Sequence, residues 1–270
     1  MKKIYFLLVL LVCPFYVGAL DLASNAKSAI IIEPTTGKVI FEKNSNERLE
    51  PASMTKIMTL LLTFEAIDNG KISLDDTVTI SKRAADMGGS RMFLEAGSNI
   101  RLEEIIKGVS IASANDGAIA LAEFVGGSVE NFVDMMNKKA EDLGLSNTHF
   151  VNPHGLHADN HYSSAYDMAL MASNLINHEK ILNYTSIYED YFNKPDGSRT
   201  WLVNTNKLVR FFEGVDGLKT GYTQEAGYCL TATAKKGNVR YITVVMGEPS
   251  SDIRSRETTN MLNYAFNSFK

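Results

Sequence analysis

Both ends of the chain contain short apolar runs rich in β-branched residues, and these runs predict β-strands. Near the N-terminus, Ser28–Ile32 and Lys38–Phe41 flank a turn with proline and glycine, which predicts a hairpin. Near the C-terminus, Tyr228–Ala234 and Val239–Met246 flank a second glycine-containing turn. The last segment, Asp252–Phe269, has apolar residues at helical spacing and predicts a closing amphipathic helix.

The middle of the chain shows apolar residues at helical spacing instead. Thr77–Ile80 is the one short strand expected there, and the expected helices are Ser53–Asn69, Arg101–Ala112, Ala118–Val125, Val129–Leu143 and Ser163–Ile176. We therefore expect an α+β fold with one antiparallel sheet built from both chain ends and covered by flanking helices. The sheet lobe would contain residues 24–50 and 214–270, and a helical lobe would contain residues 70–200.

Length and composition are those of a globular protein. The 270 residues are 45% hydrophobic and 21% charged, which is enough to bury a large core and excludes a disordered chain. We find no internal repeat, low-complexity tract or proline-rich linker, so residues 20–270 are expected to form a single domain. The net charge of −4 argues against nucleic acid as a partner.

Residues 1–19 have the pattern of a secretory signal. Lys2 and Lys3 precede the apolar run Ile4–Val12, and Val17–Ala19 offers small residues for cleavage. The alternative is an N-terminal anchor that is not cleaved, although the apolar run is short for a membrane span and is followed by Pro14. The signal predicts export to the extracytoplasmic face of a bacterial envelope, in the periplasm or cell wall.

Cysteine content agrees with that location. After cleavage the chain would keep only Cys229, so no internal disulfide could form. An exported protein without disulfides fits a bacterial envelope better than a eukaryotic extracellular space. Cys229 lies in an apolar run and is expected to be a buried structural thiol.

The first candidate for chemistry is a serine that lies three residues before a lysine, Ser53 and Lys56. If a helix starts near Ser53, the two side chains share one face about a turn apart. A serine becomes a good nucleophile when a base removes its proton, and a desolvated lysine can be that base. The helix N-terminus adds N–H groups that suit a developing oxyanion. Alone, however, this pair is common by chance.

Two later stretches add the groups that such a mechanism needs. Ser113 and Asn115 fall in a tight connection between two predicted helices and offer a hydroxyl and a carboxamide. Lys219, Thr220 and Gly221 open the strand-rich C-terminal part with a cation, a hydroxyl and a glycine that would let a substrate backbone approach closely. Each stretch is ordinary by itself. Together and in this order, they match the signature set of penicillin-recognising serine enzymes.

At this point the chain resembles the low-molecular-mass penicillin-binding proteins, the serine-type D-Ala-D-Ala carboxypeptidases of peptidase family S11. The resemblance extends from about Ala26 to Phe269. It rests on the segments Glu50–Thr59, Gly88–Leu94, Asn152–Leu156, Asp167–Ala169, Asn204–Leu208 and Gly214–Thr223. It implies a fold like that of β-lactamases and transpeptidases.

The resemblance also implies roles for individual residues. Ser53 would attack the carbonyl between two terminal D-alanines of a peptidoglycan stem peptide, and Lys56 would accept its proton. The backbone N–H groups of Ser53 and Tyr222 would form the oxyanion hole. Ser113 and Lys219 would pass the proton to the leaving D-alanine. The substrate-binding residues would be Asn115, Thr220, Gly221, Tyr222 and Arg254, with Arg254 suited to a carboxylate because its planar fork can bind both oxygens.

No cofactor or metal is expected, and β-lactams should acylate Ser53 as covalent inhibitors. Many family members continue into a β-rich domain and an amphipathic anchor helix. The sequence stops at Lys270, so we expect neither of these, and peripheral association with the membrane stays open. Tyr222 stands where some relatives have histidine, which removes any imidazole role but leaves the backbone N–H.

Three alternatives stay open from the sequence. A β-lactamase of the same fold is one, because Glu179–Asn183 matches a Glu-x-x-Leu-Asn pattern, although at an unusual position in the chain. A metal site is another, with His154, His157 and His161 as ligands by spacing. The third is a non-catalytic relative that binds penicillin or peptidoglycan.

Overall fold

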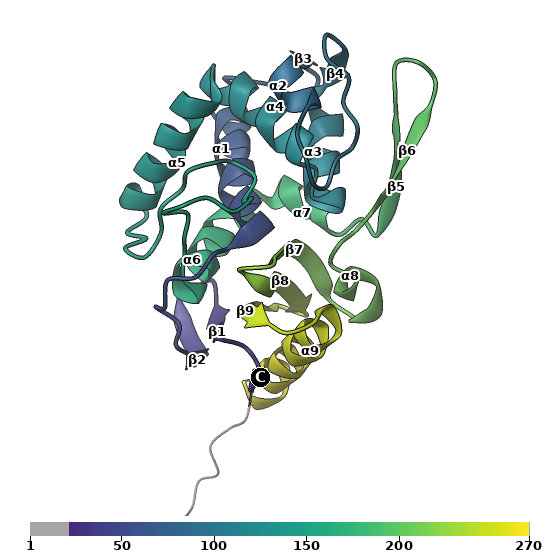
Figure 1. Ribbon diagram of the computed structural model, residues 1–270. Helices are drawn as coiled ribbons and strands as arrows, with labels where there is room; N and C mark the ends of the chain where they lie inside the picture. The colour runs from purple at the N-terminus through teal and green to yellow at the C-terminus, as the bar shows by residue number, and fades with distance from the viewer. Residues whose placement is uncertain (1–21, 270) are drawn as a thin grey trace, which may run out of the picture.

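The computed structural model describes residues 22–269, so the predicted signal at residues 1–19 lies outside the described part. Its main sheet has five strands in the order β2-β1-β9-β8-β7 (Figure 1). The strands are β1 Ser28–Glu33, β2 Lys38–Lys43, β7 Val215–Thr223, β8 Gly227–Lys236 and β9 Val239–Glu248. All neighbours pair antiparallel, and β1 pairs with β9. The predicted α+β fold with a sheet from both chain ends is therefore confirmed.

Strand periodicity explains why helices cover both faces of this sheet. Along β1, Ile30 and Ile32 point into the core shared with the helical lobe, whereas Ala29 and Ile31 point to the opposite face. That opposite face is covered by helix α9, Ser251–Ser268, which buries Met261 and other apolar residues against it. A strand buried on both faces reads as a continuous apolar run, which is what the sequence shows.

The helical lobe is built around α1, Lys56–Asp68, which is buried along most of its length. It packs among α4 and α6 and lies between the sheet and the outer helices (Figure 1). The other helices here are α2 Lys82–Ala85, α3 Leu102–Ala112, α4 Asn115–Gly126, α5 Val129–Asp142 and α6 Ala165–Ile176. Two short strands, β3 Thr77–Thr79 and β4 Asn99–Arg101, pair beside them.

Two expectations were wrong. Ser53 does not lie in the long helix but in a 3₁₀ turn, η1 Ala52–Thr55, and α1 begins at Lys56. Pro51 precedes this turn, and Ala52 has a φ of +46°, so the backbone cannot be continuously α-helical there. The turn still keeps Ser53 and Lys56 on one side of the chain.

The middle of the chain is also less helical than expected. After η2 Glu179–Ile181 and α7 Leu182–Thr185, strands β5 Glu189–Asn193 and β6 Arg199–Val203 form a projecting hairpin, followed by α8 Leu208–Phe211 (Figure 1). Only one residue of each strand, Phe192 and Leu202, is fully buried. That left too weak an apolar signal for the hairpin to be predicted. Within residues 22–269 no helix is both long and apolar enough to cross a membrane.

Candidate active site

The centre of the site is the contact between Ser53 and Lys56. The Lys56 Nζ atom is 2.9 Å from Ser53 Oγ, 2.7 Å from Asn115 Oδ1 and 2.7 Å from the His154 carbonyl oxygen. The Lys56 side chain is fully buried, whereas Ser53 is only half-buried. A hydroxyl that a substrate can reach therefore contacts an amine that water cannot reach.

These contacts orient the amine when it is neutral. A neutral amine has two N–H groups and one lone pair. The His154 carbonyl oxygen can only accept, and Asn115 Oδ1 is fixed as an acceptor because Asn115 Nδ2 donates to the Gly88 carbonyl at 2.8 Å. With both N–H groups used in this way, the lone pair is directed at Ser53, whose O–H then donates to Lys56 Nζ. This is the geometry that a general base needs.

Electrostatics favour the neutral form of this lysine. Burial lowers the pKa of Lys56 well below its ordinary value, and the nearby positive charge of Lys219 lowers it further, with Asp116 partly opposing both. The pKa of Lys219 falls to about 7, first because of burial and then because of the Arg254 charge. With these lowered pKa values, either amine loses its proton more readily than an ordinary lysine does.

The connection between α3 and α4 brings Asn115 into contact with Lys56 and carries Ser113 two residues before it. Ser113 follows the last residue of α3 with a φ of +61°, and Asn115 is the first residue of α4. The Asn115 backbone N–H donates to the Ser90 carbonyl at 2.7 Å. Ala52 and Ser113 thus both carry positive φ beside the expected catalytic hydroxyls, and strained backbone of this kind concentrates at functional sites.

Lys219 and Thr220 come from β7, the edge strand of the sheet nearest the helical lobe (Figure 1). Lys219 is buried, and its Nζ donates to the Thr220 carbonyl at 3.0 Å. The Thr220 hydroxyl donates to Thr205 Oγ1 at 2.7 Å. Arg254, from α9, is also buried, and its Nε has no hydrogen-bond partner within residues 22–269. Together Lys219 and Arg254 provide positive charge suited to an anionic ligand.

Gly221 also has a structural reason that was not expected from the sequence. A Cβ atom at this position would lie 2.6 Å from the Pro51 carbonyl oxygen and 3.3 Å from the Met54 nitrogen. The glycine therefore lets β7 pack directly on the turn that carries Ser53. The next residue, Tyr222, turns its ring outwards, where it is 56% exposed and stacks on Tyr228 at a centroid distance of 4.3 Å. The backbone N–H of Tyr222, and not its side chain, is therefore the candidate donor to an oxyanion.

One functional segment was assigned no role from the sequence. In Asn152–Leu156 the contact with Lys56 comes from the His154 carbonyl, and the Pro153 carbonyl accepts from Thr59 Oγ1 at 2.6 Å. Gly155 has a φ of +84°, and a Cβ atom there would overlap the Ala52 carbonyl oxygen. The glycine pattern was visible in the sequence, but a contact made by a backbone oxygen leaves no side-chain signal.

The three histidines do not share a site. His161 Nδ1 accepts from the Val151 N–H, so its Nε2 donates to Thr55 Oγ1 at 2.7 Å, and His154 Nδ1 accepts from the Leu156 N–H. Burial lowers the pKa of His154 to about 3 and that of His161 to about 4. His157 lies at the surface, 2.8 Å from Glu50. These partners indicate a structural role for the two buried imidazoles.

Glu179, the residue of the β-lactamase pattern, lies in η2. It lines a surface hollow together with Lys235 and Arg240, and none of the expected site residues lines this hollow. Its position therefore gives no support to a role in activating water near Ser53.

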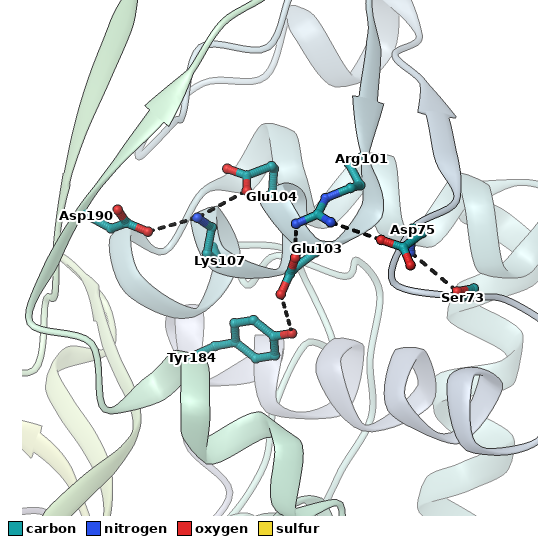
Figure 2. A network of polar contacts seen from close by, with 8 residues as sticks. All are labelled: Ser73, Asp75, Arg101, Glu103, Glu104, Lys107, Tyr184 and Asp190. Atoms are coloured by element: carbon teal, nitrogen blue, oxygen red, sulfur yellow. Dashed lines mark hydrogen bonds and ion pairs between the residues drawn. The ribbon is translucent and has the colours of Figure 1, made fainter.

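A network of polar contacts holds α3, whose C-terminal end leads to Ser113. Lys107 is bonded to Glu104 at 3.1 Å and to Asp190 of β5 at 2.8 Å, as Figure 2 shows. On the next face of the helix, the Tyr184 hydroxyl donates to Glu103 at 3.0 Å. Burial, and then the Glu103 hydrogen bond, raise the pKa of Tyr184 to about 12. These contacts join α3 to β5 and α7.

Comparison with known proteins identifies the family. The family model described as D-alanyl-D-alanine carboxypeptidase, peptidase S11, matches residues 17–250. The chain belongs to this family. It is 56% identical to the D-alanyl-D-alanine carboxypeptidase DacF of Bacillus subtilis over 93% of this chain and 64% of that protein. It is 40% identical to DacA of Escherichia coli strain K12 over 91% of this chain and 62% of that protein. The chain thus spans a little under two thirds of these relatives.

Solved structures of the family confirm the fold. Penicillin-binding protein 5 of Haemophilus influenzae superposes with a TM-score of 0.85 at 36% identity, over 90% of this chain and 71% of that one. Penicillin-binding protein D2 of Listeria monocytogenes, solved in an ampicillin-bound form, superposes with a TM-score of 0.80 at 30% identity, over 92% and 98%. The resemblance inferred from the sequence motifs is therefore confirmed.

Proposed function

We propose that this protein is a serine D-Ala-D-Ala carboxypeptidase that removes the terminal D-alanine from peptidoglycan stem peptides. The observation that carries the proposal is the fully buried Lys56 amine 2.9 Å from the Ser53 hydroxyl, with its other two contacts both acceptors. The S11 family match and the names of the relatives supply the substrate class.

Acylation begins when Ser53 Oγ attacks the carbonyl carbon of the bond between the two D-alanines, while Lys56 Nζ takes the hydroxyl proton. The carbonyl oxygen becomes an oxyanion, and the backbone N–H groups of Ser53 and Tyr222 stabilise it. Removing one such donor typically costs a few kcal/mol of transition-state stabilisation. The closeness of β7 to the η1 turn, which Gly221 permits, supports this pairing of donors.

Collapse of the intermediate breaks the C–N bond, and the leaving D-alanine nitrogen takes a proton delivered through Ser113 and Lys219. A Lys219 pKa of about 7 suits a group that gives and takes protons near neutrality. Water then attacks the acyl-enzyme, which releases the shortened peptide and restores the Ser53 hydroxyl. β-Lactams acylate the same oxygen when their ring amide opens.

Substrate binding uses the positive charge beside β7. Thr220 and Arg254 hold the terminal carboxylate of the substrate, and Asn115 holds the amide on its acyl side. The unpartnered Nε of Arg254 and the burial of its guanidinium support this assignment, because a buried cation gains most from a charged partner. Residues 1–19 direct export to the extracytoplasmic face, where peptidoglycan lies.

The test uses diacetyl-Lys-D-Ala-D-Ala as substrate and the same peptide ending in L-alanine as control. The wild type should release D-alanine from the first peptide only, and Ser53→Ala should release none. Rapid hydrolysis of a β-lactam without D-alanine release would instead identify a β-lactamase. Transfer to an added amine, in preference to water, would identify a transpeptidase. N-terminal sequencing of the exported protein tests cleavage after Ala19.

A further inference from the structure

Three large aromatic side chains lie exposed on and beside the β5–β6 hairpin. Phe93 is 49% exposed, Tyr191 is 47% exposed and Trp201 is 59% exposed. Tyr191 and Trp201 lie on the hairpin itself, and we call this pair the aromatic surface; Phe93 lies beside the hairpin, next to Lys194. Large aromatic side chains that stay exposed on a projecting element are candidates for a binding surface, because burying them against the fold would stabilise it.

The hairpin itself accounts for this exposure. Tyr191 and Trp201 are cross-strand partners, so their side chains share one face of the two-stranded sheet. The alternate residues Phe192 and Leu202 point to the other face, and each is only 1% exposed. One face therefore anchors the hairpin on the body, and the other face presents the Tyr191 and Trp201 rings to solvent.

Polar and cationic groups surround these rings. The Arg199 guanidinium lies 5.0 Å from the Tyr191 ring centroid, and Trp201 Nε1 donates to Glu189 at 3.2 Å. Arg91 lies 4.9 Å and Lys194 lies 5.8 Å from the Phe93 ring centroid. The rings thus alternate with charged donors and acceptors. A continuous apolar patch, which is typical of stable protein interfaces, is not what these residues form.

Phe93 is held in this position at a cost in backbone energy. Its φ is +63°, which is an unfavourable conformation for a bulky residue. The flanking N–H groups of Met92 and Leu94 both donate to the buried Asp116 carboxylate, at 3.1 and 3.0 Å. Asp116 follows Asn115 in α4, so the same turn of helix fixes the ring outwards and fixes the carboxamide that contacts Lys56.

The hairpin that carries the aromatic surface contacts α3 and the Gly88–Met92 stretch, and both of these lead to expected site residues. The Thr200 hydroxyl of β6 donates to the Met92 carbonyl at 3.2 Å, and the Gly88 carbonyl accepts from Asn115 Nδ2 at 2.8 Å. On the other side, Asp190 of β5 pairs with Lys107 of α3, as Figure 2 shows. The hairpin is thereby fixed to the two elements that carry Ser113 and Asn115.

From this placement we propose that the aromatic surface binds the glycan of a peptidoglycan strand whose stem peptide enters the active site. The inference rests on the proposed function, because a stem peptide is covalently joined to a glycan that must lie outside the site. Sugar rings have faces of C–H groups that pack on aromatic rings, and hydroxyl and N-acetyl groups at their edges that hydrogen-bond to flanking Arg, Lys and Glu. The alternation of rings and charges on this surface matches that chemistry.

Binding can be measured without catalysis, because Trp201 is the only tryptophan of the chain. We expect its fluorescence to change saturably on titration with chitotetraose, an N-acetylglucosamine oligomer without peptide. Tyr191→Ala should weaken this binding about tenfold. Phe211→Ala is the matched control: Phe211 is 69% exposed but lies on α8, so its removal should leave the titration unchanged. No saturable response, or an equal loss in both variants, overturns the proposal.

A second measurement links the surface to catalysis. Trp201→Ala should lower kcat/KM for a glycan-bearing muropeptide about tenfold relative to kcat/KM for diacetyl-Lys-D-Ala-D-Ala. Equal losses on the two substrates would contradict a glycan subsite and indicate a structural effect, which the unfolding temperature of the variant would reveal. If the wild type hydrolyses neither substrate, the proposed function fails, whereas the chitotetraose titration still decides whether the surface binds glycan.

Discussion

Replacing Lys219 with methionine should stabilise the folded protein while impairing acylation. Methionine has a similar length and is apolar, so it can fill the buried position that the lysine occupies. The pKa of Lys219 is about 7 in the folded protein, against an ordinary value of 10.5. At about 1.36 kcal/mol per pKa unit, folding at pH 7 loses about 4 kcal/mol by burying this amine. Loss of the hydrogen bond to the Thr220 carbonyl returns about 2 kcal/mol, which leaves a net stabilisation of about 2 kcal/mol.

The dependence of this gain on pH follows from the direction of the pKa shift. Because the folded pKa is lowered, the unfolded chain holds the extra proton between about pH 7 and 10.5, so wild-type stability rises with pH across that window. The advantage of Lys219→Met should therefore be largest at or below pH 7 and shrink towards pH 10.5. Urea unfolding of both proteins at pH 6, 7, 8 and 9 measures the difference.

At pH 7 a gain of about 2 kcal/mol corresponds to a rise in Tm of roughly 4–8 °C for a domain of this size. The net cost assigned to burying the Lys219 amine would be refuted if Lys219→Met were less stable than the wild type at pH 7. It would equally be refuted if the difference between the two proteins stayed constant from pH 6 to 9, since a titrating amine cannot give a constant difference.

Three further outcomes follow from the same contacts. Asn115→Asp places a carboxylate where Oδ1 lies 2.7 Å from Lys56 Nζ, so the pKa of Lys56 should rise. The acid limb of the pH–rate profile for penicillin acylation should then move up by about 1–3 pH units. An unmoved limb would exclude Lys56 as the base. Gly155→Ala should lower the free energy of unfolding in urea by several kcal/mol, because its Cβ would overlap the Ala52 carbonyl. Gly144, the control, also has a positive φ but open space around it, so Gly144→Ala should lower the free energy of unfolding by about 1 kcal/mol. Equal losses would argue against the close contact at Gly155. Cys229 should resist iodoacetamide at pH 8 until the protein is unfolded, because it is buried and burial raises the pKa of its thiol to about 11. Labelling of Cys229 in the native protein would show that β8 opens.

The sheet could be predicted from the sequence because its strands are apolar on both faces. Ile30 and Ile31 point to opposite sides of β1, and each finds a separate core. The pairing of β1 with β9 could not be read directly, since strand order depends on contacts between segments about 200 residues apart. The β5–β6 hairpin was missed for the opposite reason: Phe192 and Leu202 alone are buried, so its alternation was weak.

At the site, contacts made by side chains could be predicted from the sequence, whereas contacts made by backbone atoms could not. Ser53, Lys56 and Asn115 could be proposed from spacing, because their chemistry lies in side chains, and the structure brings them into direct contact. The third contact of Lys56, with the His154 carbonyl, could not, because any residue offers a carbonyl. The packing role of Gly221 could not be predicted either, since the atoms that exclude a Cβ there belong to the Ser53 turn, far away in the sequence.

The mechanism proposed for this site requires neutral Lys56 as the base for Ser53. The most direct test measures the rate of penicillin acylation from pH 5 to 9 by intact-protein mass spectrometry, with Ser53→Ala as control. Because burial lowers the pKa of Lys56 well below 10.5, we expect a rate that rises with pH and reaches its plateau well below pH 10.5, with one adduct that Ser53→Ala lacks. A rate that is flat across this range, or an adduct that persists in Ser53→Ala, would contradict this mechanism.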